Sequence, residues 1–260
     1  MRHLLLIFLC FLFNPYFSNA QKKDTVFITE KNVTTTVLRE GTHRYLVYFK
    51  MKKDATRTQT QFWTRKIERT TQNEKPVIIV TQEWEDKDSI VHTVKSVCAG
   101  ITMKPITHEF WWKQRGSTAV NFENKTLQFN GSLLTDADTV KQKKAVWSAF
   151  KSTGDNYFLN WHLDMEVLPT LPYKNGATFI IPFYDPGTGS PFEKVAYTVT
   201  GSAELIGYND QKIDCWLLVN ESKGNKEVFW ISKKTKEVLK LEQEINGSLY
   251  RYKIKLGFSM

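Results

Sequence analysis

The chain has 260 residues, of which 41% are hydrophobic and 24% are charged, and its formal net charge is +9. Enough apolar side chain is present to build one large or two small domains, which excludes a disordered chain. The 13 glycines and 8 prolines are too few for a collagen-like or linker-like sequence.

The first twenty residues have the pattern of a secretory signal peptide. Arg2 and His3 precede an apolar run from Leu4 to Phe13, and Ser18 and Ala20 place small residues at a cleavage site. The alternative is an uncleaved membrane anchor, but the run is about half the roughly twenty residues that cross a bilayer. We therefore expect residues 1–20 to be removed. The mature chain is then exported, as a periplasmic, outer-membrane-associated or extracellular protein without a transmembrane segment.

After this segment, apolar and polar residues alternate with a period of two. The segment 43–51 places Tyr45, Val47, Phe49 and Met51 on one side, which is typical of a half-buried strand. The same pattern predicts strands at 77–84, 90–97, 118–123, 127–129 and 198–205. Short polar turns separate neighbouring segments, so we expect a largely antiparallel sheet.

The last predicted strand follows Asn246-Gly247, a strong hairpin signal. Its alternation predicts that Tyr250, Tyr252, Ile254 and Leu256 enter the core. Arg251, Lys253 and Lys255 would then face water.

One segment is predicted to be helical. From Asp155 the apolar residues are spaced three or four apart, with Asp155 placed to cap the start and Pro169 to end the helix. The polar segment 138–144 before it is predicted to be a surface loop. We therefore expect a mainly β (α+β) fold in which residues 21–260 form a single β-rich domain. A curved antiparallel sheet or partly open β-barrel would pack against one amphipathic helix over about residues 155–168.

Residues 98–258 resemble the domain-of-unknown-function 3108-like family of exported, Bacteroidetes-type bacterial proteins. The matching motifs are Lys104-Pro105, Leu171-Pro172, the string 197–201, Asp214-Cys215-Trp216, and the segments 229–235 and 238–240. The resemblance implies a curved antiparallel sheet partnered by a helix, as in periplasmic carriers that shield acyl chains. It implies no established activity and no catalytic residues. Residues 21–97 would add strands to the same sheet.

The sequence offers no catalytic, metal or cofactor motif. His108-Glu109 is followed by Phe110 and the two tryptophans and not by the second histidine of a zinc protease helix. His162 and Glu166 are four apart and could share a metal on a helix, although a helix-face salt bridge is the simpler interpretation. We therefore predict no catalytic residues, no metal and no cofactor.

Aromatic residues and cysteines supply the candidate site residues. Adjacent strand residues point to opposite faces, so Trp111 and Trp112 cannot both enter one core. These two and Trp161, on the predicted helix, are candidate ligand-binding residues. Cys98 and Cys215 remain after cleavage and could either pair in an oxidising compartment or be buried as separate thiols.

Two functional hypotheses follow. In the first, the protein is a non-enzymatic envelope protein that binds a hydrophobic or lipid-like ligand, or a cell-envelope partner, in a groove of the curved sheet. This groove would be lined by apolar and aromatic side chains and contain few buried ionisable groups. In the second, it is an exported hydrolase or lyase whose site is assembled from distant residues, such as His108, Glu109 and an Asp. Nucleic acid is not an expected partner, because the cations that alternate with aromatic rings are predicted to lie on a solvated face.

Overall fold

A single curved sheet dominates the structure, a computed structural model that describes residues 24–257. The predicted signal peptide and Cys10 lie outside the described residues. The strands are β1 (Thr25–Phe27), β2 (Gly41–Lys50), β3 (Gln59–Gln72), β4 (Lys75–Asp86), β5 (Ser89–Ala99), β6 (Pro105–Trp112), β7 (Gly116–Asn121), β8 (Thr126–Phe129), β9 (Ser132–Leu133), β10 (Leu159–Asn160), β11 (Thr178–Tyr184), β12 (Glu193–Ile206), β13 (Lys212–Ser222), β14 (Asn225–Ser232), β15 (Val238–Ile245) and β16 (Leu249–Leu256). The α-helices are α1 (Lys141–Lys151) and α2 (Asp164–Val167), and short 3-10 turns lie at Glu30–Asn32, Thr35–Val37, Trp161–Leu163, Leu168–Thr170 and Tyr208–Asp210.

Two antiparallel meanders make up this sheet. Strands β2 to β9 follow one another in the first meander, and β11 to β16 follow one another in the second. The last strand, β16, pairs with the first strand of the other meander, β2, so the two form one continuous surface. Among the described strands, only the short β1 and β10 pair in parallel, both with β11. The expected fold, a mainly β protein with a curved antiparallel sheet, is confirmed.

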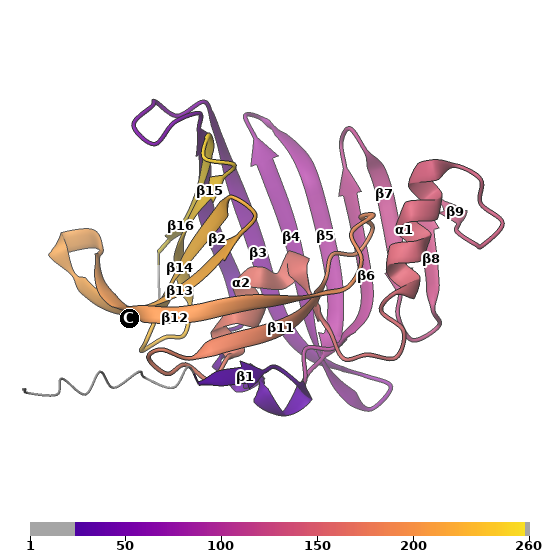
Figure 1. Ribbon diagram of the computed structural model, residues 1–260, viewed down its shortest axis with the longest axis horizontal. Coiled ribbons are helices and arrows are strands. Elements are labelled where there is room, and N and C mark those ends of the chain that lie inside the picture. Colours follow the sequence, from indigo (N-terminus) through magenta and orange to yellow (C-terminus); the bar gives the residue numbers. More distant parts are fainter. Residues whose placement is uncertain (1–23, 258–260) are drawn as a thin grey trace, which may run out of the picture.

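The chain passes through the inside of the curve between the two meanders. In Figure 1, α2 lies in the space that β3, β4 and β5 enclose together with β11 and β12. The main hydrophobic core surrounds it: Leu163, Met165 and Val167 pack with residues of both meanders, among them Val47 and Phe229. The segment around α2 therefore fills the lower part of the space inside the curved sheet.

The predicted helix over 155–168 is wrong in its extent. Residues 159–160 instead form a strand with β11, and helical turns begin only at Trp161. The Asn160 side chain caps them by accepting a hydrogen bond from the His162 N–H at 2.9 Å, while Asp155 is exposed and pairs with Lys125. Apolar residues recur here because the segment is surrounded by the sheet on several sides, so their spacing did not define one helix face.

The helix α1 begins within residues 138–144, which were predicted to be a surface loop, and continues to Lys151. Its first residues, which overlap the predicted loop 138–144, are polar and exposed apart from the partly buried Lys143. The buried stripe begins with Val146 and continues through Ala149 and Phe150. These residues form a second, smaller core with β7 and β8 through Val120 and Leu127. The apolar part of α1 is short, which is why its periodicity was missed.

The last strand, β16, buries the face that was predicted to be exposed to water. Lys253 and Lys255 are buried, at 3% and 5% exposure, whereas Tyr252 stacks on Tyr48 at 4.8 Å between ring centroids. Register explains this, because Lys253 lies directly opposite Val47 of β2 and must share its inward face. The alternation predicts the strand β16, but the residues that it places in the core are those on the opposite face from the buried lysines.

Candidate functional site

Charged side chains meet at the centre of the concave face. Arg65 of β3 donates two hydrogen bonds to Glu166 of α2, with Nε–Oε1 at 2.8 Å and Nη2–Oε2 at 2.5 Å. Lys253 of β16 binds Asp164 through an Nζ–Oδ2 contact of 2.8 Å, and Arg65 lies 3.7 Å from the other oxygen of Asp164. Both cations occupy inward positions of their strands, where ordinary β-sheet alternation places them.

These contacts shift the pKa values of Asp164 and Lys253. Burial alone would raise the pKa of Asp164, but the charges of Lys253 and Arg65 outweigh it and lower this pKa. Burial lowers the pKa of Lys253 to about 8, although Asp164 acts to raise it. Asp164 and Lys253 are therefore both ionised at neutral pH, and each needs the other to remain so at this depth.

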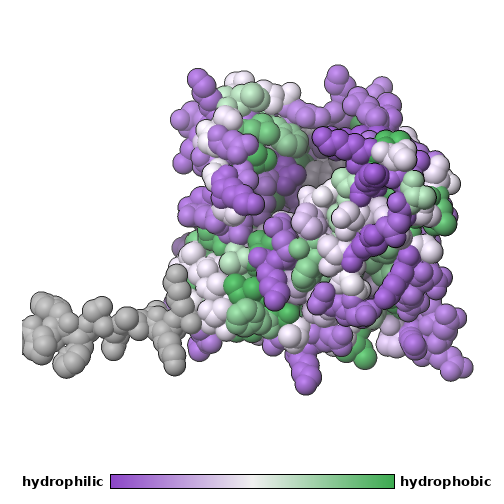
Figure 2. Space-filling view, turned by 45° about the vertical axis from the view of Figure 1, so that its right-hand side comes forward, coloured by the Kyte–Doolittle hydropathy of each residue, from purple (hydrophilic) through white to green (hydrophobic). Residues whose placement is uncertain are grey.

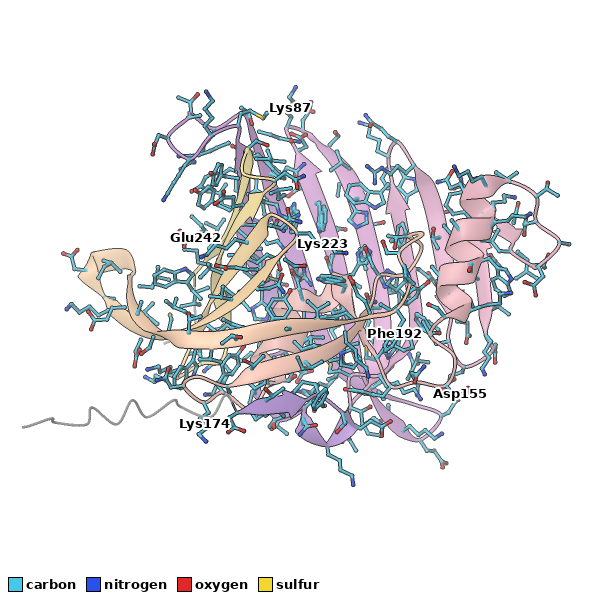
Figure 3. All side chains as sticks on the ribbon, viewed as in Figure 1. Lys87, Asp155, Lys174, Phe192, Lys223 and Glu242 are labelled. Carbon is cyan, nitrogen blue, oxygen red and sulfur yellow. The ribbon has the colours of Figure 1, made fainter. Side chains whose placement is uncertain are left out.

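A pocket of about 310 Å³ opens beside this cluster, and we call it the concave pocket. Residues from both meanders and from the crossing segment line it, so no single local motif contains it. The surface in Figure 2 shows a recess with hydrophilic residues around it, and Figure 3 shows side chains projecting from the strands into the space around α2. The lining residues are Trp63, Arg65, Trp84, Trp161, His162, Asp164, Asp185, Glu227, Gln243, Arg251 and Lys253.

Three tryptophans supply the apolar part of the lining. Trp63 and Trp84 stack at 3.5 Å between centroids, and Lys253 Nζ lies 4.8 Å from the Trp63 ring, so this ring is enclosed. Trp161 stacks on Phe183 at 5.3 Å. Because Trp161 is partly exposed and borders the pocket, its ring is available to a ligand.

Two polar atoms of the lining are buried without a hydrogen-bond partner among the described residues. They are Arg251 Nε and Gln243 Oε1. Gln243 also donates to Glu227 through Nε2–Oε1 at 2.6 Å, and Tyr197 donates to the second oxygen of Glu227 at 2.8 Å. Burial raises the pKa of Glu227 and lowers that of Arg251. Unpaired buried donors and acceptors are costly, so these atoms favour a bound polar group.

Three histidines lie beside the pocket. The centroids of His108 and His162 are 4.8 Å apart, and those of His92 and His162 are 6.0 Å apart. His162 Nε2 lies 3.0 Å from Asp185, in a loop that packs closely on β6. Gly187 permits this approach, because its φ is +78° and a Cβ there would lie 2.6 Å from the Phe110 ring.

The catalytic cluster considered in the sequence does not assemble. Glu109 is exposed on the opposite face of β6 from the buried His108. The Nδ1 atom of His108 contacts Ser96 Oγ at 2.8 Å and Asn160 Nδ2 at 2.9 Å. Ser96 is fully buried, so its hydroxyl fixes the imidazole and is inaccessible to a substrate.

The option of a metal shared by His162 and Glu166 also gains no support. His162 pairs with Asp185, and Glu166 pairs with Arg65. Within residues 24–257, no three histidine, cysteine or carboxylate side chains are grouped as metal ligands.

The three predicted ligand-binding residues have different environments. Trp161 borders the concave pocket. Trp112 stacks on His92 at 3.8 Å and borders a separate hollow of about 210 Å³. Trp111 is 39% exposed and points to the other face of β6, as expected because adjacent residues of a strand point to opposite faces. Cys98 and Cys215 are buried free thiols, so the structure has the unpaired alternative.

Most of the charged lining was missed from the sequence. Arg65 could have been found by extending the alternation of β3 from Trp63 and Ile67, which are buried on the same face. Arg251 and Lys253 required the pairing of β16 with β2, about two hundred residues away in the chain. Glu227 and Gln243 likewise depend on strand register.

Comparisons with known proteins identify a family. No curated protein matches the sequence. A crystal structure titled as a β-barrel-like protein of domain of unknown function DUF1849, from Brucella abortus, is similar over 84% of this chain and 98% of its own, with 6% identity and a TM-score of 0.31. Among residues 24–257, no helix has the length and apolar character needed to cross a membrane. A family model matches residues 44–255, which adds β2 to β5 to the part that carried the resemblance. The chain belongs to the family described as "Protein of unknown function (DUF3108)".

Proposed function

We propose that this protein is exported and acts as a binding protein, with its ligand in the concave pocket. The N-terminal pattern of residues 1–20 supports export. The observation that carries the binding role is the pocket itself, in which two buried polar atoms have no partner among the described residues. A preformed concavity with a few convergent polar groups is the usual form of a ligand site.

The lining favours a different ligand from the purely hydrophobic one expected from the sequence. Buried and partly buried cations and carboxylates line the pocket beside the tryptophans, and a lipid chain would leave these charges without solvation. The ligand we propose has a flat apolar face for Trp161 and polar groups for Arg251 and Gln243.

Native mass spectrometry of the protein isolated from its own cell envelope tests this role. We expect a bound mass that is lost in Trp161→Ala and retained in Trp111→Ala, a matched control on the outer face. An empty wild-type protein, or equal loss in both variants, would contradict the proposal. Circular dichroism of each variant verifies that the fold is intact.

A second candidate, hydrolysis of the bound ligand, is favoured by one observation. Glu227 and Asp164 line the same pocket, and their pKa values are shifted in opposite directions, upward for Glu227 and downward for Asp164. One carboxyl with a raised pKa and one with a lowered pKa in the same pocket is a common arrangement for acid–base cleavage. Glu227 would protonate the leaving group, and Asp164 would take a proton from the water whose oxygen bonds to the other fragment. Solvent would then carry this proton back to Glu227, so that the net reaction is addition of one water across the broken bond.

The ligand recovered from a Glu227→Gln variant tests this second candidate. If hydrolysis occurs, the variant retains an intact ligand that the wild type converts into two smaller products. Glu242→Gln is the matched control, because Glu242 is the neighbour of Gln243 in β15 and does not line the pocket. Identical ligand masses from wild type and Glu227→Gln would exclude this activity.

A further inference from the structure

A second hollow shares three lining residues with the concave pocket. This side pocket, of about 470 Å³, is bordered by β12, β13, β14 and β15, and the turn that carries Lys223 lies at its edge (Figure 3). Trp161, Glu227 and Gln243 belong to the lining of both pockets. Trp161, with Glu227 and Gln243, is therefore where a ligand in one pocket comes nearest to the other pocket.

Trp161 lines both pockets, and one face of its ring is stacked on Phe183. Its ring is nearly parallel to that of Phe183, with an interplanar angle of 16°, so the stack fixes its orientation. Its remaining surface is shared by the two pockets. A rigid, flat, partly exposed aromatic ring suits a ligand that presents a flat face of C–H groups and polar atoms around its edge. A sugar ring has this chemistry.

The polar atoms at the junction indicate what surrounds that ring. Gln243 Oε1 is an unused acceptor, which a hydroxyl group can fill. Arg251 Nε is an unused donor. Arg65 and Lys253 already form ion pairs with Glu166 and Asp164, whereas Arg251 has no hydrogen-bonded carboxylate among the described residues. The cation that remains for an anionic ligand group is therefore Arg251.

The side pocket carries charge of both signs. Glu193 and Glu221 are matched by Lys194 and Lys223 in its lining, Glu227 adds a third carboxyl group there, and Glu221 also pairs with Lys226. These charges give no preference for an anion there. An acidic group of the ligand is thus expected at the Arg251 end, and neutral, hydroxyl-rich units are expected beyond Trp161.

We propose that the two pockets together bind a short saccharide chain, with one sugar ring on Trp161 and the carboxylate of an acidic sugar at Arg251. This inference rests on the proposed binding function and specifies its ligand class. Arg251 pairs bidentately with the carboxylate, and Gln243 accepts a hydroxyl hydrogen bond.

A glycan array that displays uronate-containing, sialate-containing and neutral oligosaccharides tests the ligand class with the full chain. We expect the wild type to bind acidic oligosaccharides and to bind neutral ones of equal length at least about tenfold more weakly. Arg251→Met should lose about tenfold or more in affinity for the acidic glycans, and Arg251→Lys should lose less because it retains the charge. Trp161→Ala should lose binding, whereas Trp111→Ala should bind as the wild type does.

Controls separate this inference from loss of the fold and from the function it rests on. Arg251→Met removes a partly buried guanidinium that forms no salt bridge among the described residues, so its unfolding midpoint should stay close to that of the wild type. The inference is overturned if the wild type binds no oligosaccharide on the array, or if Arg251→Met binds acidic glycans as well as the wild type. If the array shows no binding, but native mass spectrometry finds a non-saccharide ligand that Trp161→Ala loses, only the ligand class is overturned. An empty array together with no bound mass would overturn the proposed function as well.

Discussion

Arg65 and Glu166 form the most enclosed ion pair described here, with side-chain exposures of 1% and 3%. Arg65→Met leaves the Glu166 carboxylate buried without its partner. We expect the free energy of unfolding to fall by about 3–5 kcal/mol. Arg65→Met combined with Glu166→Leu should recover most of this loss, because the unpaired charge is then removed. Urea unfolding measures all three proteins.

The exposed pair Lys66–Glu68 provides the control for that experiment. Its two atoms are 2.7 Å apart, but both side chains are about half exposed. Lys66→Met should therefore cost less than about 1 kcal/mol. Equal losses for Arg65→Met and Lys66→Met would show that burial does not determine the contribution of the inner pair.

The buried histidines make stability depend on pH. Burial and the nearby His162 lower the pKa of His92 to about 3, and burial also lowers the pKa of His108. Below pH 6.5 the unfolded chain takes up protons that the folded chain does not, so stability is lost as pH falls. Each histidine should contribute roughly 1.4 kcal/mol per pH unit over this range. Urea unfolding at pH 7, 6 and 5 measures the slope.

His92→Phe retains the ring that stacks on Trp112 and removes one titrating group. We expect this variant to reduce the change of stability with pH by the contribution of one histidine, roughly 1.4 kcal/mol per pH unit. It should also lower stability by a constant amount at every pH, because the Trp111 carbonyl loses its hydrogen bond from His92. An unchanged slope in this variant would contradict the assignment of His92.

At the scale of elements, α1 stabilises one end of the sheet through few residues. Phe150, at 5% exposure, packs in the smaller core against Phe122 at 6.0 Å between ring centroids. Phe150→Ala should lower the free energy of unfolding by about 3–5 kcal/mol. Lys144→Ala, on the exposed side of the same helix, should change it by less than about 0.5 kcal/mol. Similar values for both variants would show that α1 is not packed as described.

The elements also show which sequence signals were informative. Alternation predicted β2, β4 and β5 well, because Val47 and Val80 pack in the main core and Val94 is buried on its strand. It did not predict which face of β16 is buried, because cations occupy the inner face where carboxylates neutralise them. Helical spacing placed the start of the helix too early, because Phe158 and Leu159 are apolar and buried but precede the helical turns that begin at Trp161. Long-range register, and with it most of the concave pocket, depends on pairings that a local pattern does not contain.

At the scale of the whole molecule, the two meanders share one core and meet at the pairing of β16 with β2. The pocket takes Arg65 from the first meander and Glu227 from the second, so it exists only when both are folded together. Pairings between such distant segments favour slow, cooperative folding. The single domain predicted from the sequence should therefore unfold in one transition.

The two buried cysteines test this cooperativity, because each reports on one meander. Cys98 lies in β5 and Cys215 lies in β13, and burial raises the pKa of their thiols to about 12 and about 11. Without residues 1–20, and hence without Cys10, neither thiol should react with a thiol reagent in the native protein, and two should react in urea. In the single-cysteine variants Cys98→Ala and Cys215→Ala, reactivity should appear at the same urea concentration as the loss of tryptophan burial. Exposure of Cys98 well before Cys215, or the reverse, would show that the meanders unfold independently. No reactive thiol in urea would reveal a disulfide between them.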